Sequence, residues 1–165
     1  MVALRCLYLI ALVFWVGGMV ALGAFAAPAT FDVLEAYHGA TGRLEAGDVF
    51  DEMLRRFRYF EYGSAVILLG SLGALGARDR KLPALGVRIG TVVIMLAISL
   101  YAGLGIANQV AGLQTEIQGN MSAWTDSSIY AARFDSLYVQ TTILLLLNLG
   151  LGLSLIYWEA RARIS

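Results

Sequence analysis

Four long apolar runs, separated by segments rich in charged residues, constrain this chain most strongly. They cover residues 7–27, 62–77, 89–111 and 137–158. A hydrocarbon core about 30 Å thick needs roughly 20 apolar residues in a helix. Three runs meet that length, and the second meets it by including residues 57–61. The pattern therefore predicts a protein that crosses a membrane four times.

The share of apolar sequence points to one membrane domain. Of the 165 residues, 59% are hydrophobic and the mean hydropathy is +0.71, whereas soluble domains are about 45–50% apolar. We expect an all-α, polytopic membrane protein with a single integral membrane domain, 1–165. Its fold would be a four-helix transmembrane bundle with spans at approximately 5–27, 57–77, 88–111 and 137–159.

Basic residues are distributed unequally between the two sides of such a bundle. The side with both termini and the loop near 78–88 carries seven Lys and Arg residues, against five on the other side. Because cytoplasmic loops carry an excess of Lys and Arg, we expect both termini in the cytoplasm and two larger acidic loops outside.

An amphipathic segment precedes the second span and is predicted to extend its helix. Pro28 allows a helix to restart, and residues 29–37 would form an interfacial helix. Gly42 and Gly47 are expected to interrupt the chain, so that Asp48 caps the new helix. Apolar residues then recur at helical spacing up to the membrane. The second helix should therefore start well outside the bilayer.

Small and polar residues within the spans are candidates for helix packing. Lipid tails are as apolar as leucine, so close backbone approach and interhelical hydrogen bonds must hold membrane helices together. Two interpretations stay open: a surface for dimerisation or a partner, and ordinary packing within one bundle. The candidate packing residues are Gly17, Gly18, Gly70, Ala74, Gly86, Gly90 and Asn148.

The sequence shows no catalytic signature. No charged residue is expected in the middle of a span, and Glu61 is interpreted as a residue of the outer edge, solvated or paired with Arg58. With Cys6 and His38 as its single cysteine and single histidine, the chain cannot supply two haem-binding imidazoles or a Cys/His zinc site. We therefore expect no cofactor of its own, no enzymatic activity and, at zero net charge, no nucleic-acid partner.

The first acidic loop contains a weak candidate for a metal site. Asp32, Glu35 and His38 follow one another at i,i+3 spacing, which places them on one helix face. The alternative is a solvated acidic surface, which is the commoner origin of such a pattern.

Short motifs in the first and last spans resemble a known family. Trp15-Val-Gly17-Gly18 is followed by a segment with Pro28 and Phe31, then by Gly47, and Phe134 enters the last span. Together they resemble a bacterial membrane family that is described as a domain of unknown function and is related to eukaryotic transmembrane protein 205.

The resemblance implies a four-helix bundle of the bacterial cytoplasmic membrane without established enzymatic activity. Roles proposed for the family lean towards metal handling or membrane transport. One departure matters: the family tends to place a histidine after Phe-Asp-x-Leu, where this chain has Tyr138. A role that depends on that histidine would be weakened here.

Two functions are consistent with these features. The first is a non-catalytic accessory subunit that packs against a larger membrane complex, for example a redox or photosynthetic assembly, or against further copies of itself, and contacts lipids or a partner's pigments or quinones. The second is a small metal-cation or solute permease or resistance protein that acts as an oligomer.

Overall fold

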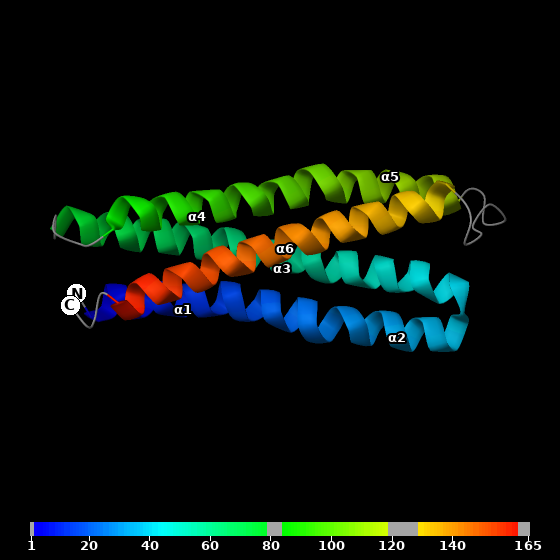
Figure 1. The fold of residues 1–165 in the computed structure, drawn as a ribbon, viewed down its shortest axis with the longest axis horizontal. Coiled ribbons are helices and arrows are strands. Elements are labelled where there is room, and N and C mark those ends of the chain that lie inside the picture. Colours follow the sequence, from blue (N-terminus) through cyan, green and yellow to red (C-terminus); the bar gives the residue numbers. More distant parts are fainter. Residues whose placement is uncertain (1, 79–83, 119–128, 162–165) are drawn as a thin grey trace.

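Four long helical rods form an antiparallel bundle in the computed structural model, which describes residues 2–78, 84–118 and 129–161. Both chain ends lie at the same end of the bundle (Figure 1). We call this the terminal end and the opposite end, near α2 and α5, the distal end. The rods consist of α1 (Val2–Val20), η1 (Ala21–Ala26) and α2 (Ala27–His38); α3 (Ala40–Arg78); α4 (Leu85–Leu100), η2 (Tyr101–Ile106) and α5 (Ala107–Gln118); and α6 (Ile129–Arg161).

Each rod is long and apolar enough to cross a membrane. The four candidate spans are Ala3–His38, Thr41–Arg78, Leu85–Gly112 and Asp135–Arg161, and each contains one of the spans expected from the sequence. The predicted all-α four-helix transmembrane bundle is thus confirmed. At 1.5 Å per residue, α3 is about 58 Å long, so the bundle extends well beyond a hydrocarbon core of about 30 Å.

The second helix begins earlier than predicted. Helix α3 starts at Ala40 and runs through Gly42 and Gly47 without interruption, and the turn is made by Gly39 at φ 60°. A side chain at Gly42 would collide with the Leu34 carbonyl of α2, so its hydrogen lets the two helices meet closely. The expectation of a new helix at Asp48 was wrong because packing against α2 outweighs the ~1 kcal/mol cost of each helical glycine.

Two π-helical segments interrupt the first and third rods. Segment η1 ends two residues before Pro28, which has no amide hydrogen for the ordinary bond and whose ring crowds the preceding turn. In η2, the amide of Ala107 bonds to the carbonyl of Ala102, five residues back. Such wide turns redirect backbone carbonyls towards neighbouring groups and are frequent at functional sites.

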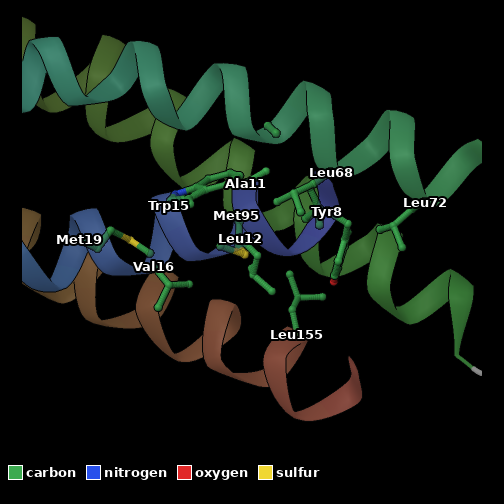
Figure 2. Close-up of a cluster of buried hydrophobic side chains, with 12 residues drawn as sticks. Tyr8, Ala11, Leu12, Trp15, Val16, Met19, Leu68, Leu72, Met95 and Leu155 are labelled. Atoms are coloured by element: carbon green, nitrogen blue, oxygen red, sulfur yellow. The ribbon is translucent and has the colours of Figure 1, made fainter. Parts of the chain in front are cut away.

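The core lies where all four rods meet, towards the terminal end. Leu12, Trp15, Leu68, Met95 and other side chains from α1, α3, α4 and α6 are fully buried and interlock there (Figure 2). In lipid this packing stabilises the bundle through close van der Waals contact, since the surrounding solvent is itself apolar.

The candidate packing residues divide into two groups. Gly18 lies directly under the Phe57 ring of α3, and Asn148 bonds across to α4. Gly17, Gly70, Gly86 and Gly90 have no atom within 4 Å of an added Cβ, and Ala74 is half-buried. These four glycines therefore do not act as close-contact points within the bundle.

Gly152 is a point of close contact between helices, although the spacing of small residues in the sequence did not single it out. An added Cβ there would lie 2.5 Å from Val16 Cγ2 and 3.4 Å from Met95 Cε. Valine is stiff at χ1, so it cannot move aside easily. We expect Gly152→Ala to lower the free energy of unfolding by about 1–3 kcal/mol, measured by denaturation in detergent micelles.

Gly150 is the matched control for that substitution. It lies on the same helix, is exposed, and has nothing within 4 Å of an added Cβ. Gly150→Ala should be neutral or stabilising by up to ~1 kcal/mol through helix propensity. Equal losses in the two variants would contradict close packing of α6 on α1.

Candidate functional site

A buried carboxylate lies at the centre of the bundle. Glu61 of α3 is 7% exposed, and its Oε1 accepts a hydrogen bond of 3.2 Å from the Trp15 indole nitrogen of α1. Trp15 itself is fully buried. A carboxylate withdrawn from water is costly unless polar groups surround it. Glu61 is therefore a position that the rest of the bundle must accommodate.

Polar side chains from two further helices lie beside Glu61. Asn148 of α6 donates through Nδ2 to the Ser99 hydroxyl oxygen of α4 at 3.0 Å, and Ser99 adjoins the Glu61 carboxylate. Asn148 Nδ2 also points at the Met95 carbonyl, 3.4 Å away. The Oδ1 atom of Asn148 is buried and has no hydrogen-bond donor among the described residues. All four rods thus contribute to one polar layer, which contains a free acceptor.

Arg58 brings a positive charge to the distal side of this layer. Its Nη1 donates to the Gly103 carbonyl in η2 at 3.3 Å, and its Nη2 lies 3.9 Å from Asp51 Oδ1. Gly103 permits this approach, because an added Cβ would lie 3.0 Å from Arg58 Cδ and 2.9 Å from the Tyr62 hydroxyl. Arg58 thus lies close to Asp51 and lines the same space as Glu61.

The polar layer lies deep in the membrane-crossing part of the bundle. Ser99 and Asn148 are each eleven residues from Arg88 and Glu159, respectively, which form a buried ion pair near the terminal end. Eleven helical residues span about 16 Å. A hydrocarbon core of about 30 Å that begins at this ion pair places the Glu61 layer near its middle.

The interpretation of Glu61 as a solvated residue was wrong, because the residue is 7% exposed and accepts a hydrogen bond from Trp15. In the sequence, Glu61 directly precedes the apolar run of α3, which made it look like a boundary. The facing rods, however, continue their apolar sequence well past this level, so the depth of Glu61 is set by its neighbours. By the depth estimated above, Glu61 lies where no charge was expected.

A small cavity, partly open to its surroundings, adjoins the polar layer. This Glu61 cavity measures about 50 Å³, and its polar lining is Arg58, Glu61, Ser99, Thr141 and Asn148. A volume of roughly 10–15 Å³ on this measure accommodates one water molecule when polar partners are present. The Glu61 cavity is thus large enough for a few water molecules or a small ion.

A second cavity continues towards the distal end. This distal cavity, also about 50 Å³, is lined by aromatic residues, by Asp51 and, like the Glu61 cavity, by Leu54 and Thr141. Phe31 makes edge-on contacts with Phe50 and Tyr138, at centroid distances of 6.4 and 5.4 Å. The two cavities therefore share part of one wall.

The terminal end is closed by a different set of contacts. Arg88 of α4 and Glu159 of α6 form an ion pair although they are 3% and 7% exposed. The Arg88 guanidinium lies 5.2 Å from the centre of the Tyr8 ring. Between this pair and the Glu61 layer, Leu12, Leu155 and other fully buried side chains fill the section (Figure 2).

The three weak metal candidates of the first acidic segment do not come together. His38 Nδ1 lies 2.6 Å from Glu45 Oε2 of α3, and both side chains are half exposed. Across residues 2–78, 84–118 and 129–161, no group of three or more His, Cys, Asp or Glu side chains could hold a metal ion. Asp32, Glu35 and His38 therefore do not form a metal centre in this structure.

Several residues of the family-like motif lie at the two cavities or beside them. Trp15 binds Glu61, Phe31 and Gly47 line the distal cavity, and Pro28 stands at the start of α2. The side chain of Phe134 lies outside the described part of the structure. Tyr138 lines the distal cavity.

The fold and this site define a class: a polytopic helical membrane protein with a polar layer inside its bundle. A family model described as "Domain of unknown function (DUF4149)" matches residues 10–118, more than half of the chain. The protein belongs to this family. Neither the curated proteins nor the solved structures contain a significant match.

The buried ion pair gives a direct test of the terminal closure. Arg88→Met leaves Glu159 buried and unpaired, so we expect it to lower the free energy of unfolding by about 3–5 kcal/mol. Arg43→Met breaks an ion pair with Asp135 whose side chains are 44% and 56% exposed, and should cost less than about 1 kcal/mol. Denaturation in micelles measures both values.

The double variant Arg88→Met/Glu159→Leu completes the cycle. It replaces the pair by apolar groups of similar size and should recover most of the stability lost in Arg88→Met. A double variant no more stable than Arg88→Met would show that the loss does not come from an unpaired Glu159.

Proposed function

We propose that this protein binds a small cation at Glu61 inside the membrane and acts as a small-cation permease, or as the cation-binding component of one. The observation that carries the proposal is the buried carboxylate beside a cavity with a free acceptor, Asn148 Oδ1. Ionisable groups inside membrane bundles are rare because they are costly, and they commonly mark ion pathways.

A purely structural role explains the Glu61 layer less well. A carboxylate could tie α3 to α1 through Trp15, but a neutral amide would do so without burying a charge. The cavity is also left open beside the carboxylate, where a structural network would be filled by side chains. These two features favour binding over packing.

The setting of this function is part of the proposal. The chain would reside in the bacterial cytoplasmic membrane with both termini in the cytoplasm, would not be an enzyme, and would be related to transmembrane protein 205. One bundle encloses little space, so a complete pathway would be built from several copies. Transport roles discussed for the related family agree with this assignment.

Cation flux into proteoliposomes tests the proposal. We expect protein-dependent uptake of at least one probe among protons, K⁺ and Mn²⁺, followed with a pH dye, a K⁺ dye and Mn²⁺ quenching. Glu61→Gln should reduce that uptake about tenfold or more. A tenfold loss of affinity corresponds to ~1.4 kcal/mol of cation-binding free energy.

Glu45→Gln is the matched control. Glu45 lies on the same helix but is half exposed and pairs with His38, so its substitution should leave the flux unchanged. Equal flux in the wild-type protein and Glu61→Gln, or no flux of any of the three probes, would count against the permease.

A second candidate, the accessory subunit, is favoured by one observation. Gly63, Gly70 and Gly73 are exposed on α3, and nothing lies within 4 Å of a Cβ added at any of them. Small residues on a lipid-facing helix allow another helix to approach closely. This surface would dock a second membrane protein or another copy of the chain.

Substitution of Gly70 tests whether α3 docks another chain. If α3 docks a partner, Gly70→Leu should reduce the mass of the particle extracted in mild detergent, measured by light scattering, to that of one bundle. Gly17→Leu, on an exposed position of α1 that is equally open, should leave the mass unchanged. A wild-type particle that already has the mass of one bundle would contradict the accessory role.

A further inference from the structure

We propose that the cation bound at Glu61 is a proton, and that in this conformation of the bundle Glu61 exchanges it with water from the distal end only. This inference rests on the proposed cation-binding function and adds to it the chemical class of the cation and the direction of access. Three features of the structure carry it: the ligands at the site, the charges around it and the position of the cavities.

The ligand set favours a proton over a metal ion. The Glu61 cavity offers one carboxylate, the amide oxygen of Asn148 and two hydroxyls, whereas Ca²⁺ takes about 6–8 oxygen ligands and Mg²⁺ requires about six in an octahedron. The Arg58 guanidinium lines the same cavity and repels a metal ion. A proton needs a single carboxylate oxygen and no coordination shell.

The neighbouring charges suit a carboxyl group that gains and loses a proton. Trp15 faces Glu61 from α1, Ser99 from α4 and Asn148 from α6, and none of them is charged. The charged neighbours are Arg58 and, beyond it, Asp51. Arg58 can balance Glu61 when the latter is ionised and remains balanced by Asp51 when Glu61 is neutral.

The chemical step is a simple proton transfer. A water molecule in the Glu61 cavity gives a proton to a carboxylate oxygen of Glu61 and at the same time takes one from the next water along the route, so that an O–H bond forms at Glu61 and the cavity water stays neutral. The free Oδ1 of Asn148 and the hydroxyls of Ser99 and Thr141 provide hydrogen-bonding partners for that water. When the proton is released, the O–H bond of Glu61 breaks and the proton returns to a water molecule in the cavity.

Access from the distal end follows from the two cavities. Leu54 and Thr141 belong to the walls of both the Glu61 cavity and the distal cavity, so a small movement of these side chains joins the two spaces. Asp51 lines the distal cavity and provides a polar group along this route. The route leads away from the end that carries the termini (Figure 1).

Access from the terminal end is opposed by packing. Leu12, Leu68, Met95 and Leu155 are completely buried between Glu61 and that end, and Figure 2 shows them interlocked. The Arg88–Glu159 ion pair lies beyond them. Water would have to separate this core before it could reach Glu61 from the terminal side.

Trp15 supplies an internal reporter for the proton. Its indole N–H donates to Glu61, so neutralising the carboxylate removes a negative charge beside the indole nitrogen. That charge stabilises the excited state of indole, whose pyrrole ring becomes electron-poor. In the background Trp124→Phe/Trp158→Phe, acidification should therefore shift the emission maximum of Trp15 to shorter wavelength. Adding Glu61→Gln should abolish the shift.

The direction of access is read in proteoliposomes with an external pH jump. An N-terminal protease-cleavable tag reports the fraction of molecules whose terminal end faces the outside. The molecules whose Trp15 emission changes within the mixing time should be those whose tag is not cleaved. A response from the cleaved fraction, or from all molecules alike, would overturn distal access.

Two adjacent threonines provide matched variants for the passage. Thr141 lines both cavities, whereas Thr142 is exposed on the outside of the bundle, and each hydroxyl donates to the carbonyl four residues earlier. Thr141→Leu should slow the Trp15 response and Thr142→Leu should not. Equal rates in the two variants would contradict the route past Thr141.

The Trp15 emission also distinguishes failure of this inference from failure of the proposed function. If K⁺ or Mn²⁺ at constant pH changes the Trp15 emission and flux of that ion depends on Glu61, the cation site stands but the proton assignment is wrong. If neither pH nor these cations change the emission of a folded protein, both are wrong. A shift with pH alone supports both.

Discussion

The hydrogen bond from Trp15 to Glu61 is the interaction on which the rest of the site depends. It joins α1 to α3 at the level where the Asn148–Ser99 bond joins α6 to α4. A membrane supplies no hydrophobic force between helices, so polar contacts at this depth fix their relative positions. The same contacts lower the cost of burying the carboxylate, and the cavity beside it leaves room for a bound cation.

The bundle is different at its two ends. At the terminal end, close packing and the Arg88–Glu159 pair leave the section filled. Towards the distal end, the π-helical segment η2 offers a carbonyl to Arg58, and the helices enclose two adjoining cavities. This asymmetry is what the proposed one-sided exchange requires, since a site open to both sides at once would short-circuit an ion gradient.

The sequence predicted the architecture well because apolar runs of membrane length permit few folds. It predicted helix boundaries less well: Gly42 and Gly47 looked like interruptions, but α3 is helical through both, and Gly42 packs against the Leu34 carbonyl of α2. The depth of Glu61 was not predictable from α3 alone, because it depends on the facing helices. Gly152 was missed because its role comes from its contact with Val16 rather than from small-residue spacing.

The most direct test of the central claim is the infrared difference spectrum between acidic and neutral pH in reconstituted membranes. Glu61 should contribute the carbonyl stretch of a protonated carboxylic acid in an apolar setting, and that band should vanish in Glu61→Gln and persist in Glu159→Gln. A spectrum without such a band, or a band that remains in Glu61→Gln, would contradict the assignment of Glu61 as the proton-binding group.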